Sequence, residues 1–107
     1  MIYLDNSATT PTLPAAADRA RQYMTEEFFN PAAAYSPAVR EERAVNAARK
    51  TVAGAINAAG EEIIFTSGGS EADNQAIISA ARIGAKKGKK HIISTAFEHH
   101  AVLHTLQ

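Results

Sequence analysis

The chain has 107 residues, of which 46% are hydrophobic and 21% charged, and this composition is typical of one small soluble globular domain. Lys plus Arg and Asp plus Glu number 11 each, and no apolar run is long enough to cross a bilayer, so we expect neither a nucleic-acid nor a membrane partner. The absence of cysteine excludes a disulfide, a thiolate metal ligand and a cysteine nucleophile within the chain, and it fits the cytoplasmic location that we expect.

The chain begins with a polar loop and a first helix. Small polar residues from Asp5 to Pro11 favour turns, and this loop either simply leads into the helix or lines a pocket for a polar substrate. A helix is predicted from Pro14 to about Phe28, because proline suits a first turn and the apolar residues recur at helical spacing. Asn30 and Pro31 then end it.

A second helix is predicted from Pro37 to Gly60, with Ser36 as its N-cap. An apolar stripe follows one face of this helix and consists of Val45, Ala48, Val52, Ala55, Ile56 and Ala59. The opposite face is predicted to be solvated and carries Glu41, Arg43, Asn46 and Lys50. If nothing covered the stripe, it would leave a large apolar surface, so we expect it to pack against another element or another chain.

The second half of the chain alternates between strand and helix patterns. Ile63–Thr66 and His91–Thr95 are rich in β-branched side chains and predict two short buried strands. A helix is predicted between them, up to the break at Gly88, and a further helix from about Glu98. This β-α-β-α order predicts an α/β fold with parallel strands. Two parallel strands are not a finished sheet, so we expect a domain that is incomplete within this chain.

The connection between the first strand and its helix, Phe65–Asn74, reads F-T-S-G-G-S-E-A-D-N. Gly68 and Gly69 permit backbone angles closed to other residues and a close approach to a ligand, and Ser70 can cap the helix or donate its hydroxyl group. An anion there would meet free N–H groups at the positive end of a helix dipole. The pattern matches neither the dinucleotide nor the P-loop signature, so a plain glycine-rich connection is the alternative interpretation.

Three histidines, His99, His100 and His104, lie within six residues. The last two share one helical face at a spacing that can hold a metal, but no third ligand converges on them and we expect no metal site. We expect His99 at the carboxyl end of the second strand, near the glycine-rich turn, where an imidazole can stack on a flat ring whose phosphate lies on the neighbouring helix. A surface or half-buried position is the alternative for His100 and His104.

Four motifs in order resemble those of cysteine desulfurases in the class V aminotransferase group: Y-L-D-N-S-A-T-T-P, E-E-F-F-N-P, I-I-F-T-S-G-G-S-E-A-D-N-Q-A-I and E-H-H-A-V-L-H. The resemblance covers nearly all of this chain but only the first quarter to third of a family member. It implies the amino-terminal part of a fold-type-I enzyme with a mainly parallel sheet. Residues 1–60 would form a helical arm, and residues 61–107 would begin the cofactor-binding large domain.

The same resemblance implies a pyridoxal 5′-phosphate cofactor and a homodimer. The reaction would convert L-cysteine to L-alanine and transfer sulfur to a cysteine of the enzyme, for iron–sulfur cluster or thio-cofactor assembly with a scaffold protein as sulfur acceptor. Gly69 and Ser70 would hold the cofactor phosphate, and His99, as a catalytic residue, would stack on the pyridine ring. The substrate side is implied for three residues of the first loop: Asn6, Ala8 and Thr9.

Two features set the chain apart from the family pattern. Where family members carry small polar residues and a histidine, it has Phe29, Ala32, Ala33 and Tyr35, which leaves the substrate open. The family's Schiff-base lysine, ring-nitrogen aspartate and sulfur-accepting cysteine lie later and have no counterpart here, so we expect this chain alone to be inactive. The alternatives are a selenocysteine lyase or aminotransferase of the same group, and a non-catalytic phosphate-binding or dimerisation module.

Overall fold

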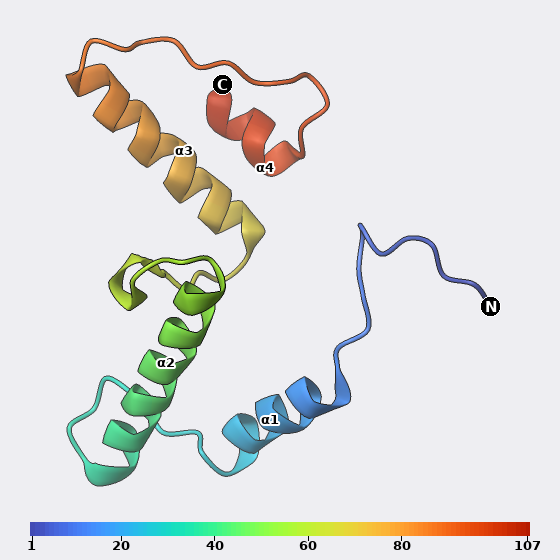
Figure 1. Ribbon diagram of the computed structural model, residues 1–107, viewed down its shortest axis with the longest axis vertical. Coiled ribbons are helices and arrows are strands. Elements are labelled where there is room, and N and C mark those ends of the chain that lie inside the picture. The colour runs from blue at the N-terminus through green and yellow to red at the C-terminus, as the bar shows by residue number, and fades with distance from the viewer. The chain divides into compact units, whose positions relative to one another are not determined.

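The computed structural model describes all 107 residues, which form helices joined by turns and extended segments and contain no β-strand (Figure 1). The chain divides into two units, Met1–Ile63 and Ile64–Gln107. The first contains α1 (Pro14–Thr25), α2 (Ser36–Ala55) and the 3₁₀ helix η1 (Gly60–Glu62), and the second contains α3 (Gly69–Lys86), α4 (His100–Leu103) and the 3₁₀ helix η2 (His104–Leu106). None of the helices is both long and apolar enough to cross a membrane. The predicted roles of residues 1–60 as an arm and 61–107 as the start of a large domain stay predictions.

The first unit begins with the polar loop that the sequence predicts. The Ala8 N–H donates to the Asp5 carbonyl oxygen at 3.1 Å and so closes a turn. The Tyr3 hydroxyl oxygen lies 2.9 Å from the carbonyl oxygens of both Asp5 and Thr9, and its one proton is donated to one of them at a time. The loop is therefore ordered by its own hydrogen bonds, although all of its residues are exposed.

Helix α1 begins at Pro14, as predicted, and ends at Thr25, three residues before the predicted end at Phe28. Phe28 instead stacks on Phe29, with the ring centroids 4.8 Å apart, and Phe29 meets Tyr35 edge-on at 6.1 Å. Aromatic rings prefer these offset and edge-to-face arrangements. Two side chains that depart from the family pattern, Phe29 and Tyr35, thus contact each other in the connection between α1 and α2.

The N-terminus of α2 differs from the prediction by one residue. Tyr35 is extended and is the N-cap, whereas Ser36 is already helical. The predicted capping role of Ser36 is wrong, because no side chain caps this helix. Pro37 still lies in the first turn, where the missing N–H of proline leaves no helical hydrogen bond unmade.

The faces of α2 match the prediction only in part, since three of the four residues predicted on the solvated face are exposed. Glu41, predicted on the solvated face, is only 6% exposed and lies one turn after the buried Ala38, so these two residues share a face. Val52 and Ile56 of the predicted apolar stripe are 45% and 66% exposed. The hydrophobic spacing therefore predicted the position of the helix correctly. Which face of the helix is buried depends on the segments that pack against it, and these leave much of the apolar stripe exposed.

Helix α2 ends at Ala55, before the predicted stop at Gly60. Asn57 has a left-handed backbone, with φ of 55°, and the Ala58 N–H donates to the Ala53 carbonyl oxygen at 2.9 Å. This bond spans six residues and defines a Schellman motif. Asparagine tolerates the left-handed region better than most residues, so Asn57 ends the helix in place of glycine.

Helix α3 ends in the same motif, with Gly88 as the left-handed residue at φ of 76°. The Lys89 N–H donates to the Gly84 carbonyl oxygen at 2.9 Å, and the Gly88 N–H donates to Ala85 at 3.0 Å. The prediction that Gly88 ends this helix is confirmed, because glycine enters the left-handed region without a steric penalty.

The predicted β-α-β-α order is not confirmed, because the structure contains no strand. Ile63–Thr66 and His91–Thr95 lack regular secondary structure, and neither takes part in a strand ladder. A parallel strand needs hydrogen bonds from a strand that lies far away in the sequence, and composition gives only a preference for such a partner. Ile93, expected in a buried strand, is 88% exposed.

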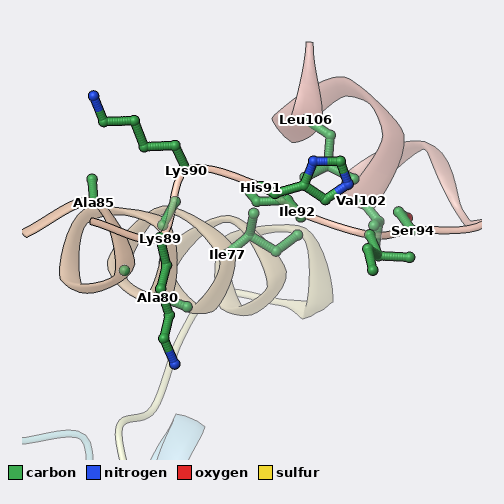
Figure 2. A pocket seen from close by; sticks show the side chains of 13 residues that line it. Ile77, Ala80, Ala85, Lys89, Lys90, His91, Ile92, Ser94, Val102 and Leu106 are labelled. Atoms are coloured by element: carbon green, nitrogen blue, oxygen red, sulfur yellow. The ribbon is translucent and has the colours of Figure 1, made fainter. Parts of the chain in front are cut away.

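In the second unit, residues 89–94 follow α3 and line an apolar recess of about 650 Å³. Figure 2 shows Ile77 of α3, Ile92 of this returning segment, Val102 of α4 and Leu106 of η2 around the recess. No residue of the second unit is buried. The apolar side chains that line this recess therefore contact α3 without forming a closed core.

The two helix ends predict opposite effects for two Gly→Ala substitutions. A Cβ atom at Gly88 or at Gly54 of α2 would meet no atom within 4 Å, so backbone conformation decides both outcomes. Gly88→Ala is expected to lower the free energy of unfolding by about 1–2 kcal/mol, because the left-handed backbone strains alanine. Gly54→Ala should raise it by about 1 kcal/mol, because alanine favours the helix. Urea unfolding measures both values, and a change of the same sign for both variants would contradict this assignment.

Candidate functional site

The N-terminus of α3 presents the N–H groups expected of an anion site. Gly68 is the N-cap and Gly69 the first helical residue, and the Ala72 N–H donates to the Gly68 carbonyl oxygen at 3.2 Å. The N–H groups of Gly69 and Ser70 precede this bond, so the helix itself does not use them. A Cβ atom at Gly68 or Gly69 would meet nothing within 4 Å, and the space beside this turn can therefore admit a ligand.

The turn does not use the special backbone angles that its glycines permit, and of the two roles open to Ser70 it does not adopt that of N-cap. Neither glycine has a left-handed backbone, since Gly88 is the glycine with positive φ in that region, and Gly68 at φ of 168° is extended as any residue can be. Ser70 is the second residue of α3 and not its N-cap, and its hydroxyl group makes no capping hydrogen bond. The predicted alternative role of this hydroxyl group, donation to a ligand, is compatible with its position.

Glu71 closes the turn before α3. Its Oε2 atom accepts from the Ser67 hydroxyl group at 2.6 Å and from the Ser67 N–H at 2.8 Å. The side-chain bond first and the backbone bond second lower the pKa of Glu71 below its ordinary value. Sequence reasoning missed this residue, although an acidic side chain in the first turn of a helix is a known signal.

His99 is the N-cap of α4, which begins at His100 and not at the predicted Glu98. The His99 Nδ1 atom accepts from the Ala101 N–H at 3.1 Å. Because Nδ1 acts as an acceptor, the proton of the neutral imidazole is on Nε2. The backbone of α4 thus fixes both the tautomer and the orientation of the His99 ring.

Ser70 and His99 line one recess of about 320 Å³ between α3 and the C-terminal helices. The recess is also lined by Asn74, His100, Ala101, His104 and Thr105. The structure thus brings two of the predicted cofactor contacts together, and Gly69 precedes Ser70 in the chain. Asn6, Ala8 and Thr9 lie in the loop of the first unit, and their substrate role stays a prediction.

The remaining histidines also belong to this recess. The rings of His100 and His104 stack with their centroids 5.3 Å apart and an interplanar angle of 17°, and the ring of His99 meets that of His100 edge-on at 6.2 Å. No group of three or more His, Cys, Asp or Glu side chains is arranged to hold a metal ion. The three imidazoles are therefore neighbours that supply flat faces and ring nitrogens to the recess.

The chemistry of this donor set fits a phosphate group attached to a flat ring. The N–H groups of Gly69 and Ser70, the Ser70 hydroxyl group and the positive end of α3 all favour an anion. The oriented imidazole of His99 offers a face on which an aromatic ring can stack. Pyridoxal 5′-phosphate combines these two chemical features, so the residues present fit this cofactor.

Glu71→Gln is expected to abolish a pH dependence of the turn. Folding lowers the pKa of Glu71, so its stabilisation of the turn is complete above the unfolded pKa, about 4.3, and is lost as the pH falls through the folded pKa. In the unsubstituted protein, the NMR chemical shift of the Ser67 amide proton should therefore titrate as the pH falls through the lowered pKa of Glu71. In Glu71→Gln it should stay constant, whereas Glu61→Gln should leave the titration unchanged. A Ser67 shift that titrates equally with and without Glu71 would contradict the assignment.

Comparisons with known proteins identify the family. The family model for class V aminotransferases matches residues 2–107. The chain is 51% identical over 106 residues to the cysteine desulfurase IscS of Clostridium botulinum strain Hall, which covers 99% of this chain and 26% of that protein. It is 49% identical over 104 residues to the cysteine desulfurase IscS of Methanosarcina thermophila, and the aligned residues are 97% of this chain and 26% of that protein.

The putative cysteine desulfurase IscS 1 of Bacillus subtilis is 43% identical over 106 residues, with 99% of this chain and 28% of that protein covered. The chain thus spans about a quarter of the length of these relatives. No solved structure matches the chain. Because the family model matches nearly every residue and the relatives are about half identical, the chain belongs to the class V aminotransferase family.

Proposed function

We propose that this chain is the amino-terminal part of a pyridoxal 5′-phosphate-dependent cysteine desulfurase, which takes sulfur from L-cysteine and leaves L-alanine. One observation carries the proposal: Ser70 and His99 line the same recess at the start of α3, in a chain of the class V aminotransferase family. The names of its relatives from three organisms support the choice of reaction.

In this proposal, the residues of the recess bind and orient the cofactor. Gly69 and Ser70 hold its phosphate through N–H groups and a hydroxyl group, and His99 covers one face of its ring. The Ala101 N–H keeps the imidazole in place and leaves the proton of His99 on Nε2. Pyridoxal phosphate, when bound, supplies the electron sink that the reaction needs.

The covalent steps need a thiol, which residues 1–107 do not contain. A thiolate must accept the sulfur, and this chain has no cysteine. We assign the thiol, the lysine that bonds to the cofactor and the carboxylate at the ring nitrogen to sequence outside these residues, since the chain spans 26% of its relatives' length. Residues 1–107 then contribute the phosphate end of the site and one face of the ring.

The proposal extends to the assembly and its partners. Ile63–Thr66 and His91–Thr95 would be neighbouring parallel strands of a fold-type-I sheet, and the exposure of Ile64, Ile92 and Ile93 supports a covering by further chain. The exposed Val52 and Ile56 support a homodimer contact on α2. A scaffold protein would accept the sulfur for iron–sulfur cluster assembly, in the cytoplasm.

A second candidate function concerns the substrate. Phe29 and Tyr35 contact each other where the family pattern has small polar residues and a histidine. This aromatic contact favours, as the alternative, a selenocysteine lyase or an aminotransferase with the same cofactor. The reaction products separate the candidates, because L-cysteine and L-selenocysteine differ in the chalcogen released.

Ser70→Ala is expected to weaken pyridoxal 5′-phosphate binding in the protein expressed from its complete gene. A hydrogen bond to a charged group contributes about 1.5–3 kcal/mol, so the dissociation constant should rise about ten- to a hundredfold. Absorbance titration of the cofactor-free protein measures this change. Ser70→Thr keeps a hydroxyl group and serves as the matched control, with an expected change below about threefold. An unaltered dissociation constant in Ser70→Ala would remove Ser70 from the phosphate site.

The second prediction separates the whole protein from the isolated segment. With dithiothreitol present to reduce the enzyme persulfide, the protein expressed from its complete gene should release sulfide and L-alanine in equal amounts from L-cysteine. A peptide of residues 1–107 should release neither, because it lacks a thiol, and borohydride reduction with pyridoxal phosphate should label none of its lysines stoichiometrically. Alanine formation by the peptide, or its absence with the whole protein, would contradict the proposed division of the catalytic groups.

A further inference from the structure

Asn74 connects the two helices that form the recess. It lies one turn after Ser70 on α3 and lines the recess with Ser70 and His99. Its Nδ2 atom donates to the Ser70 carbonyl oxygen at 2.7 Å and to the Ala101 carbonyl oxygen at 3.4 Å. A carboxamide carries two N–H donors, so each carbonyl oxygen receives one of them.

Each of these carbonyl groups belongs to a residue that places a predicted cofactor contact. Ser70 itself carries the hydroxyl group for the phosphate. Ala101 donates its N–H to Nδ1 of His99 at 3.1 Å, so the same residue that Asn74 holds also orients the imidazole. One side chain therefore links the phosphate end of the recess to the ring end, across 27 residues of sequence.

Packing of α3 against α4 and η2 also brings these two ends together, and Asn74 adds a directional contact to that packing. The segment from Lys87 to His99 that connects α3 to α4 contains no helix or strand (Figure 1), and no residue of the second unit is buried. The Thr105 hydroxyl group also donates to the Ala101 carbonyl oxygen, at 2.7 Å, but this bond stays within the C-terminal helices. The hydrogen bond from Asn74 to Ala101, by contrast, runs from α3 to α4.

We propose that Asn74 is a positioning residue that fixes the distance between the phosphate-binding Ser70 and the ring-stacking His99. The recess then recognises a phosphorylated ring as one unit, an inference that rests on the proposed function. A ligand that engages both ends gains from their fixed spacing, because its second contact forms without further loss of translational freedom. A ligand that engages one end gains nothing from Asn74.

The test compares three probes in the cofactor-free protein expressed from its complete gene: pyridoxal 5′-phosphate, pyridoxal and inorganic phosphate. In Asn74→Ala, calorimetry should show a dissociation constant for pyridoxal 5′-phosphate about tenfold higher. The constants for pyridoxal and phosphate should stay within about twofold of their original values, since each probe uses one end. Asn74→Leu keeps the shape of the side chain without its donors and should behave like Asn74→Ala. Gln75→Ala removes an exposed neighbour on α3 that makes no hydrogen bond, and it should change none of the three values.

Three outcomes would overturn the inference. Equal weakening of all three probes would mean that Asn74 supports the Ser70 turn as a whole and does not set a spacing. An unchanged affinity for pyridoxal 5′-phosphate in both Asn74 variants would remove Asn74 from the site and leave the proposed function intact. If the unsubstituted protein bound pyridoxal 5′-phosphate no more tightly than phosphate and pyridoxal, the proposed function would fail, and this inference with it.

Discussion

The candidate site depends on how the start of α3 is joined to the start of α4. No residue in this part of the chain is buried, and hydrogen bonds that end on backbone groups add to the packing of α3 against α4 in holding the recess in shape. Glu71 accepts from Ser67, His99 accepts from Ala101, and Asn74 donates to two carbonyl oxygens. The first N–H groups of a helix have no partner within the helix. A side chain that accepts a hydrogen bond from one of them is fixed in orientation by that bond. The same hydrogen bonds therefore stabilise the ends of the helices and orient the side chains of the candidate site.

The helices could be predicted from the sequence because their signals are local. Hydrophobic spacing located α1, α2 and α3, and Pro14 and Gly88 marked a beginning and an end correctly, since each restricts or extends its own backbone angles. The errors in the helix boundaries lie where two nearby residues could each be the N-cap. Tyr35 and Gly68 became the N-caps in place of the serines that follow them, because a cap is set by where the backbone leaves the helical region and not by the hydroxyl group alone.

Strand pairing could not be predicted from the sequence in the same way. The β-branched residues of Ile63–Thr66 and His91–Thr95 express a preference for a pleated and covered surface. Whether a strand forms depends on partners that pair with its N–H and carbonyl groups, and in this chain these segments pair with none. Ile92 and Ile93 are 54% and 88% exposed, so the composition that favours burial is present without the neighbours that would provide it. The local pattern thus predicts where strand-like segments lie, and it does not predict the partners that would pair with them.

The candidate site divides in the same way, between side chains that we propose contact the ligand and side chains that hold the backbone in place. Ser70 and His99 could be found from the sequence, because a hydroxyl group after two glycines and an imidazole after a strand-like segment have recognisable chemistry of their own. Asn74 and Glu71 could not, since an amide or a carboxylate on a helix is most often a solvated residue, and their function depends on which carbonyl or N–H group lies opposite. That partner is set by the return of the chain over 27 residues between Asn74 and Ala101, which spacing along α3 does not reveal. In the proposed site, a recess that matches both ends of one ligand would be specified twice: by the residues that touch the ligand, and by the residues that fix the distance between those contacts.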